Sequence, residues 1–158
     1  MKVTTKTGDQ GQTGVFNQRV EKDSAVIDLL GHLDELMSHF ILVQAHNPEH
    51  FDEFKERVNE LILMASIIAG YKPIEDFKEE TVAYLELRIK EIADSCNGFV
   101  YPFSDPMKAR LNVLRTVVRR CERVMIKAFK ESKDIPLLRI YLNRLSDYVF
   151  ILINKNYG

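Results

Sequence analysis

The 158-residue chain contains no tryptophan and only two cysteines, and its formal net charge is −1. Two cysteines, Cys96 and Cys121, cannot build a disulfide framework, and their spacing is not that of a metal site. We expect both to be small buried apolar residues in a reducing cytoplasm. The near-neutral charge argues against a dedicated nucleic-acid-binding protein, because such domains are usually strongly basic.

Long hydrophobic runs are also absent. The longest apolar stretch, residues 61–71, is much shorter than the ~20 residues that a membrane span requires. Residues 1–20 are polar and do not resemble a secretory signal. We therefore expect a cytoplasmic protein without membrane association.

The few prolines and glycines divide the chain into helical segments, and no proline falls inside a helical pattern. The expected helices are residues 24–46, 48–69, 74–96, 106–131 and 134–154. Their short connections predict an all-α, five-helix up-and-down bundle. We expect a single domain over residues 1–158, with a glycine-containing N-terminal loop (1–23) and the helical bundle (24–156).

The fourth expected helix carries an unusual density of arginine, in the stretch "RTVVRRCERV" (115–124). Arg115, Arg119 and Glu122 lie on one helix face, because residues three and four apart are neighbours. Arg123 continues this face, whereas Arg120 projects to another side. The basic character of the helix favours a small anionic ligand, although ion pairing on a solvated helix surface remains open.

The first expected helix contains a carboxylate within its apolar stripe. Asp34 lies between Leu30, Met37 and Ile41 in the helical pattern, so the sequence predicts partial burial of its charge. A buried carboxylate requires a cationic partner. Arg115 or Arg119 is the natural candidate for this partner.

The glycines of the N-terminal loop "TKTGDQGQTG" (5–14) allow backbone N–H groups to converge on an anion. The residues concerned are Thr5, Lys6, Thr7, Gly8, Thr13 and Gly14, and Lys22 could close over the same anion. The loop lacks the Walker A pattern. A disordered tail remains an alternative.

Asn143 and the histidines of the first helix are further polar residues with the chemistry of ligands. Asn143, in "YLNRLSD" on the fifth helix, offers both a donor and an acceptor, which suits the recognition of a base or a sugar. A simple surface role is equally open. His32, His39 and His46 recur every seven residues, but no histidine follows a glutamate by three, so we predict no metal-ligating set.

Together, "TKTGDQGQT", "RVEK", "HLDEL", "RTVVRRCER" and "YLNRLSD" occur in an order that resembles the PduO-type ATP:cob(I)alamin adenosyltransferases. The resemblance covers the chain from about Thr5 to Ile153. It implies an enzyme that transfers the 5′-deoxyadenosyl group of ATP to the cobalt of cob(I)alamin and releases triphosphate. It also implies a homotrimer, with each ATP site formed between neighbouring subunits and with Mg²⁺ assisting.

The resemblance implies roles for particular residues. The N-terminal loop and Lys22 would wrap the triphosphate, and Asn143 would lie at the nucleotide. Asp34 and Arg115 would form a salt bridge that shapes the site, and Phe99 would displace the lower ligand of cobalamin. The ATP-holding positions of the arginine motif would be Arg119, Arg120, Glu122 and Arg123.

The chain departs from the family pattern after Phe99. Where the family usually has Pro-Gly-Gly, Phe103 and Ser104 replace the two glycines. This change motivates a second hypothesis, a non-catalytic relative that binds ATP or cobalamin as a sensor or carrier. A helical bundle that acts only as a protein-interaction module is the third.

Overall fold

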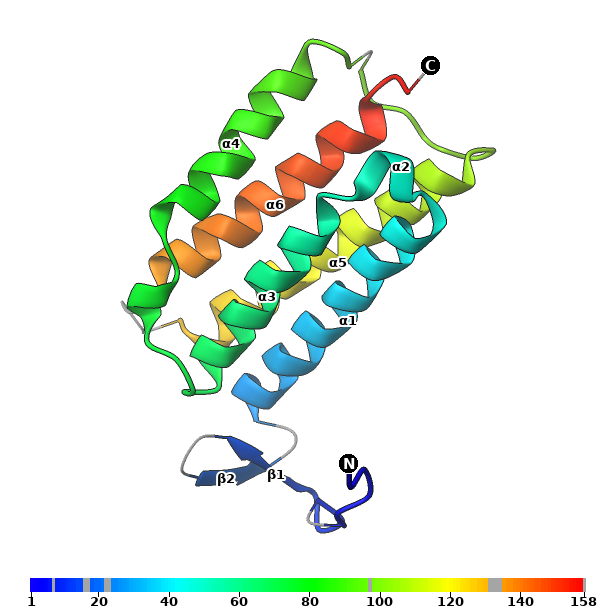
Figure 1. The fold of residues 1–158 in the computed structure, drawn as a ribbon. Coiled ribbons are helices and arrows are strands. Elements are labelled where there is room, and N and C mark those ends of the chain that lie inside the picture. The colour runs from blue at the N-terminus through cyan, green and yellow to red at the C-terminus, as the bar shows by residue number, and fades with distance from the viewer. Residues whose placement is uncertain (7, 16–17, 22–23, 97, 131–134, 158) are drawn as a thin grey trace.

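The structure, a computed structural model of residues 1–158, describes all of the chain except residues 7, 16–17, 22–23, 97, 131–134 and 158. Side chains between residues 12 and 23 are also outside the description. The long helices of the described chain are α1 (Ala25–His46), α3 (Phe54–Ile68), α4 (Glu79–Ala93), α5 (Pro106–Ala128) and α6 (Pro136–Asn154). Successive long helices alternate in direction, which confirms the predicted all-α up-and-down bundle (Figure 1).

Neighbours in space are not always neighbours in sequence. Helix α1 packs against α3 and α5, α5 packs against α6, and α6 packs against α4. Helices α4 and α6 run parallel: Phe77 and Tyr141 meet near their first turns, and Cys96 pairs with Lys155 beyond their last turns. The chain therefore crosses the end of the bundle after α4 before α5 begins (Figure 1).

Local capping explains where two of the helices begin. The Ser24 hydroxyl accepts a hydrogen bond of 3.3 Å from the Ile27 N–H, as expected for the predicted start of α1. The Asp105 carboxylate accepts one of 3.0 Å from the Lys108 N–H, and Pro106 occupies the first helical position of α5.

Several helix predictions differ from the structure in their bounds, including the predicted ends at residues 96 and 131, because α4 ends at Ala93 and α5 at Ala128. The expected helix 48–69 is divided into a single turn, α2 (Pro48–Phe51), and the longer α3. The expected helix 74–96 begins with the 3-10 turn η1 (Ile74–Asp76) before α4. The predicted helix bounds at residues 131 and 134 lie outside the described residues.

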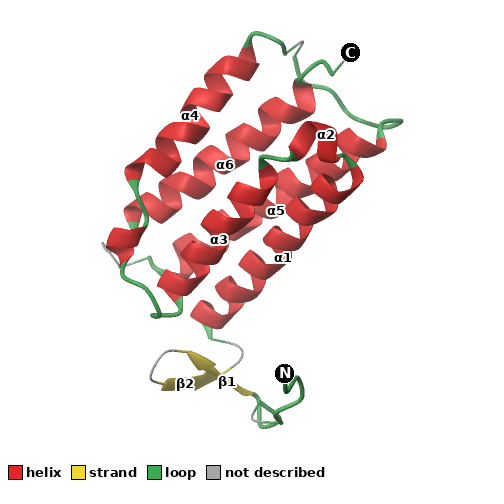
Figure 2. Cartoon of the chain, in the orientation of Figure 1, coloured by secondary structure: helices red, strands yellow, loops and turns green. Residues whose placement is uncertain are grey.

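The N-terminal segment contains a β-hairpin where a loop was predicted. Strand β1 (Gln12–Val15) pairs antiparallel with β2 (Gln18–Glu21), and Thr13 lies opposite Val20. Each strand is too short to produce a clear alternation of apolar and polar residues, which is why the sequence did not reveal it. The hairpin projects beyond the end of the bundle at which α1 begins (Figure 2).

The expected apolar stripe of α1 is confirmed only in part: Leu29, Leu33 and Phe40 lie in the core, whereas Leu30, Met37 and Ile41 are not fully buried. The buried residues of α1 are Leu29, Leu33, Leu36, Phe40 and Val43. This heptad spacing turns the stripe partly away from the predicted one, so Ile41 is 53% exposed and Asp34 is exposed. Among the described residues, no helix is long and apolar enough to cross a membrane.

A buried arginine organises the interior between α3, α4 and α6. Arg57 is 3% exposed, and its Nε and Nη2 donate to the Glu60 carboxylate at 2.8 and 2.6 Å. The Tyr84 ring lies 4.3 Å from the guanidinium carbon of Arg57, and the Tyr141 hydroxyl also donates to Glu60. The buried charges are therefore paired, as the low dielectric of an interior requires.

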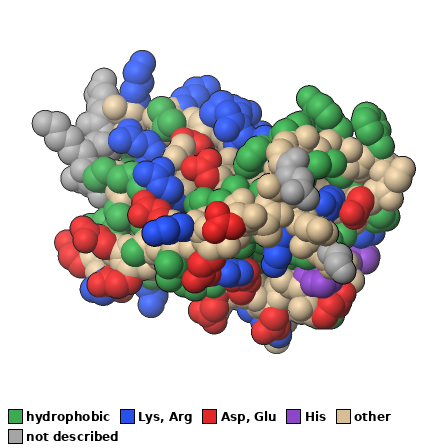
Figure 3. Space-filling view, turned by 90° about the horizontal axis from the view of Figure 1, so that it is seen from above, with side chains coloured by type: hydrophobic (Ala, Val, Ile, Leu, Met, Phe, Trp, Pro, Cys, Tyr) green, Lys and Arg blue, Asp and Glu red, His purple; other side chains and the backbone are tan. Residues whose placement is uncertain are grey.

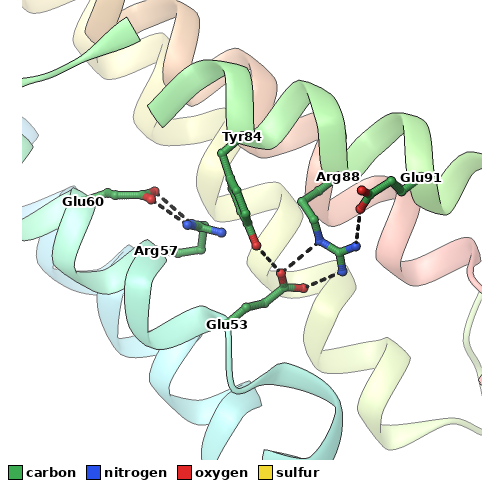
Figure 4. Close-up of polar contacts among 6 residues, drawn as sticks. All are labelled: Glu53, Arg57, Glu60, Tyr84, Arg88 and Glu91. Atoms are coloured by element: carbon green, nitrogen blue, oxygen red, sulfur yellow. Dashed lines mark hydrogen bonds and ion pairs between the residues drawn. The ribbon is translucent and has the colours of Figure 1, made fainter. Parts of the chain in front are cut away.

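Glu53 extends these contacts from the start of α3 to α4 (Figure 4). Its carboxylate accepts hydrogen bonds from the Tyr84 hydroxyl at 2.7 Å and from Nε and Nη2 of Arg88, both at 3.1 Å. Burial alone would raise the pKa of Glu53, but these hydrogen bonds outweigh burial and lower it. Arg88 also pairs with Glu91 at 2.7 Å.

We predict that Arg57→Ala lowers the free energy of unfolding by about 3–5 kcal/mol, because Glu60 is left without its buried cationic partner. Lys55→Ala is the matched control on α3. Lys55 pairs with Asp52 at 2.8 Å, but both side chains are mostly exposed, so the loss should be about 0–1 kcal/mol. Urea unfolding measures both variants, and equal losses would contradict this account.

We also predict that the free energy of unfolding of Glu53→Gln depends less on pH in the acid range than that of the wild-type protein. Because the folded-state pKa of Glu53 lies below its ordinary value of 4.5, its contribution is present above that value and is lost as pH falls through the lowered pKa. Wild-type protein should therefore lose stability more steeply below about pH 4.5 than the variant does. Urea midpoints measured across this pH range test the difference, and parallel curves would contradict it.

Candidate functional site

The charged residues of α5 divide between the two helices that flank it. Arg120 turns toward α1, where its Nη2 lies 2.6 Å from Oε1 of Glu35. Glu122 turns toward α6, where its Oε1 accepts a hydrogen bond of 3.2 Å from Nδ2 of Asn143. The hydrogen bond from Arg120 lowers the pKa of Glu35. Arg120 thus projects to a different side of α5 from Glu122, as the helical spacing predicted.

Two of the predicted arginines have no partner among the described residues. Arg119 and Arg123 are exposed, and no ion pair or hydrogen bond engages either guanidinium among the residues that the structure describes. Guanidinium groups bind phosphate and carboxylate oxygens strongly, often through two parallel hydrogen bonds. The arrangement is therefore suited to an anion bound from outside the helix.

The predicted ion pair of Asp34 is not formed within the described chain. Asp34 is exposed because the buried stripe of α1 lies to one side of it. Arg115 is half-buried and instead donates from Nε and Nη2 to Oδ1 of Asn112, at 3.1 and 3.0 Å. The ion pair that joins α1 to α5 instead uses Glu35, the residue after Asp34, and Arg120.

A hollow lies beside the Glu122–Asn143 pair, between α5 and α6. Its volume is about 280 Å³, and it is lined by Glu122, Ile126, Arg139, Ile140, Asn143 and Arg144. This volume is at the lower end of the ~300–1,000 Å³ typical of ligand pockets. Arg119 precedes two lining residues, Glu122 and Ile126, by three and seven positions, so it lies on the same face of α5 as the hollow.

Sequence reasoning missed two basic residues of this hollow, Arg139 and Arg144. A signal was present for both, since Arg139 precedes Asn143 by one helical turn and Arg144 follows it directly in "YLNRLSD". Arg144 also contacts Glu86 of α4, with Nε lying 3.0 Å from Oε1. Nothing in the spacing of the sequence indicated Glu86, because it lies on a separate helix.

The N-terminal segment forms tight turns before the hairpin. The Asp9 N–H donates to the Lys6 carbonyl at 3.3 Å, and the Gly11 N–H donates to the Gly8 carbonyl at 3.1 Å. Lys6 adopts a left-handed conformation, with φ of 60°. These two N–H groups serve the turns, so an anion would have to be bound by other groups of this segment.

The other predicted residues of the segment are placed only in part. Thr5 is exposed, and Thr13 and Gly14 contribute their backbones to β1. Thr7 and Lys22 lie outside the described residues. The segment lies at the end of the bundle where α1 begins, which is also the end toward which the arginine-bearing half of α5 runs (Figure 1).

A row of aromatic side chains lies beside the C-terminal part of α6, whereas the hollow lies beside its N-terminal part. Phe99 is 49% exposed and stacks on Phe150, with 5.8 Å between ring centroids. Tyr101 meets the Phe99 ring edge-to-face at 4.7 Å, and Phe103, 95% exposed, lies 6.4 Å beyond Tyr101. This row provides an exposed apolar surface at the start of the altered segment.

The aromatic row and the hollow lie on the same side of α6. Asn143 and Phe150 are seven residues apart, so they share a helix face and are separated by about 10 Å along the axis. Helix α5 runs antiparallel to α6, and Arg115 precedes Glu122 by the same interval. The arginine row therefore extends from the hollow toward the level of the aromatic row.

Charge is also segregated on the surface of the molecule. Seen from above, as in Figure 3, Lys and Arg side chains gather along the upper edge of the molecule, and Asp and Glu are more frequent toward the lower edge. A basic face of this kind favours the approach of a small anion.

The fold and the site define a helical-bundle protein with an arginine-rich face on α5. The family model described as Cobalamin adenosyltransferase matches residues 3–155, and the chain belongs to this family. Corrinoid adenosyltransferase from Bacillus subtilis is 35% identical over 162 residues, covering 95% of this chain and 83% of that protein. A corrinoid adenosyltransferase from Citrobacter freundii is 30% identical, covering 94% and 91%.

Solved structures agree with this assignment. An arginine-to-lysine variant of the PduO-type ATP:co(I)rrinoid adenosyltransferase from Lactobacillus reuteri, complexed with ATP, superposes with a TM-score of 0.84 at 26% identity. That alignment covers 96% of this chain and 92% of the other. A phenylalanine-to-histidine variant of the Lactobacillus reuteri enzyme, complexed with cobalamin and ATP, gives 0.85 at 27% identity and covers 97% and 89%.

Proposed function

We propose that this protein transfers the 5′-deoxyadenosyl group of ATP to the cobalt of cob(I)alamin, giving adenosylcobalamin and triphosphate. One observation carries the proposal: Arg119 and Arg123 are exposed and unpaired among the described residues, on the helix that contributes Glu122 to the hollow lined by Asn143. Family membership supplies the substrates, since related structures contain ATP and cobalamin. We expect the reaction to take place in the cytoplasm.

The arginines of α5 would act on the leaving group. Cobalt(I) attacks C5′ with its electron pair, the Co–C bond forms, and the bond from C5′ to the phosphate oxygen breaks. The bonding pair leaves on that oxygen of the triphosphate. Arg119 and Arg123 would stabilise the developing negative charge with little reorganisation, because they are already in place. Mg²⁺ would enter with ATP, held largely by phosphate oxygens.

Other residues of the site would position ATP. Asn143 would contact the nucleotide, while Glu122 and Arg120 would hold the geometry of the arginine row through their contacts with α6 and α1. Bringing C5′ and cobalt together in one orientation removes much of the entropic barrier. The triphosphate would be wrapped by the N-terminal residues Thr5, Lys6, Thr7, Gly8, Thr13, Gly14 and Lys22.

We further propose a homotrimer in which each site is completed by a neighbouring chain. The hollow on one chain is small, and the N-terminal hairpin extends away from the bundle (Figure 1). Asp34, exposed and without an ion-pair partner among the described residues, would pair with Arg115 of the adjacent subunit. Such a pair would draw Arg115 away from Asn112 and order the site upon assembly.

Phe99 would face cobalamin and displace its lower ligand, which makes the cobalt easier to reduce. Its ring is held by stacking on Phe150, and the following N–H, that of Val100, donates to Oδ1 of Asn154 at 2.9 Å. The backbone that presents Phe99 is thus anchored to the end of α6.

A second candidate function is a non-catalytic sensor or carrier of ATP or cobalamin. It is favoured by one observation, the 95% exposed ring of Phe103 where the family usually has glycine. Incubation with ATP, Mg²⁺ and chemically reduced cobalamin decides between the two, because adenosylcobalamin has its own visible spectrum. A sensor would bind ATP in calorimetry without forming product, and an interaction module would show no ATP-induced rise in melting temperature.

We predict that Arg119→Ala lowers the rate of adenosylcobalamin formation by roughly 10²–10³-fold, the usual cost of removing one preorganised donor at a developing charge. Arg119→Lys should recover part of the rate, because lysine keeps the charge but not the planar fork of donors. Arg110→Ala, on the same helix but outside the proposed site, should retain wild-type activity. Near-normal turnover by Arg119→Ala would contradict the assignment.

We predict that Asp34→Asn weakens self-association by about ten- to a thousandfold, since one half of an interfacial charge pair is removed. Asp28→Asn is the control, because Asp28 is another exposed acid of α1 and faces His32 of its own helix. Sedimentation across a range of protein concentrations measures the effect. Identical association by the two variants would show that Asp34 has no partner across the interface.

A further inference from the structure

A chain of side-chain contacts crosses three helices at the hollow. Glu86 of α4 lies 3.0 Å from Nε of Arg144, whose Nη1 donates to Oδ1 of Asn143 at 2.7 Å. Nδ2 of Asn143 in turn donates to Glu122 of α5 at 3.2 Å. Asn143 is therefore held from both sides, by α4 through Arg144 and by α5 through Glu122.

The contact between Arg144 and Asn143 is unusual for adjacent helix residues. Side chains at successive positions of a helix point about 100° apart and do not face each other. Arg144 reaches Asn143 only by folding back along the helix surface, and Glu86 binds its guanidinium in that pose. The side chains of Arg144 and Glu86 are 36% and 53% exposed, so their ion pair contributes little to stability.

This arrangement leaves one orientation for the amide of Asn143. A guanidinium group only donates hydrogen bonds, and a carboxylate only accepts them. The amide oxygen must therefore face Arg144, and the amide nitrogen must face Glu122. The reverse orientation would lose both hydrogen bonds. It would also place the amide N–H groups against the Arg144 donors and the amide oxygen against the Glu122 carboxylate.

The oriented amide keeps capacity for a ligand. Its oxygen can accept a second hydrogen bond, and its nitrogen carries a second N–H. Both remaining groups belong to a residue that lines the hollow. Their order in space is set before a nucleotide arrives, which reduces the cost of binding.

We propose that Arg144, anchored by Glu86, is a positioning residue that fixes the orientation of the Asn143 amide and thereby favours the nucleotide that this amide can recognise. The inference rests on the proposed function, which assigns Asn143 to ATP. Arg144 acts through Asn143, and it need not touch the reacting atoms.

Helix α4 offers a closely matched test. Glu86 and Glu91 are glutamates of the same helix, with side chains 53% and 49% exposed, and each lies within 3.0 Å of an arginine nitrogen. Only Glu86 connects to Asn143. We expect Glu86→Gln to raise the KM for ATP about threefold to tenfold with kcat at saturating ATP nearly unchanged, and Glu91→Gln to leave both constants unchanged.

A double-mutant cycle tests whether the effect passes through Asn143. Arg144→Met should raise the KM for ATP by about tenfold or more in the wild-type background. In the Asn143→Ala background the same substitution should have almost no further effect, because the amide that it orients is gone. Arg144→Lys should lie between wild type and Arg144→Met. Melting temperatures close to that of wild type would show that the variants remain folded.

Two results would overturn the proposal: equal constants for Glu86→Gln and Glu91→Gln, or an effect of Arg144→Met that persists in the Asn143→Ala background. Both results can be obtained only if the wild-type protein forms adenosylcobalamin from ATP and cob(I)alamin. Absence of adenosylcobalamin formation by wild type would instead contradict the proposed function, and with it the assignment of Asn143 to ATP.

Discussion

Helix α5 is packed on two sides at once, by α1 and by α6, and this placement decides where each of its charged side chains lies. Its buried stripe includes Leu114, Val118 and Cys121, so the helix cannot rotate without exposing core residues. Arg120 consequently meets α1 and Glu122 meets α6, while Arg119 and Arg123 remain open to solvent. The hydrophobic core thus sets the geometry of a site that consists of charged groups.

The other half of the bundle uses charge differently. Between α3, α4 and α6, Arg57 and Glu53 are paired, hydrogen-bonded and largely removed from solvent. These interactions join α3 to α4 through Glu53 and α3 to α6 through Glu60 and Tyr141. Helix α4 in turn supplies Glu86, which contacts Arg144 at the edge of the hollow. The internal charge network and the candidate site are therefore linked through the position of one helix, although they share no residue.

Much of the architecture follows from the sequence, because α5 and α6 each have one clear apolar face. The buried face of α1 was harder to predict, because Leu30, Met37 and Ile41 form a second plausible apolar stripe beside the buried one. That ambiguity produced the expectation of an Asp34 ion pair within the chain. The β-hairpin was missed because strands of four residues carry little periodic signal. The residues of the arginine motif, by contrast, were predicted from spacing and from resemblance to a known family, and the structure shows that Arg119 and Arg123 are exposed on α5.

The sequence by itself determined which segments are helical, which faces of α5 and α6 are buried, and that several arginines share a helix with a glutamate. These properties depend on neighbours within a few residues, and local spacing reports them. Only the tertiary structure decided which polar side chains are paired between helices. These pairs are Arg120 with Glu35, Arg144 with Glu86, and Glu122 with Asn143. Long polar side chains reach partners on other helices, and small rotations of those helices change which partner lies within hydrogen-bonding distance.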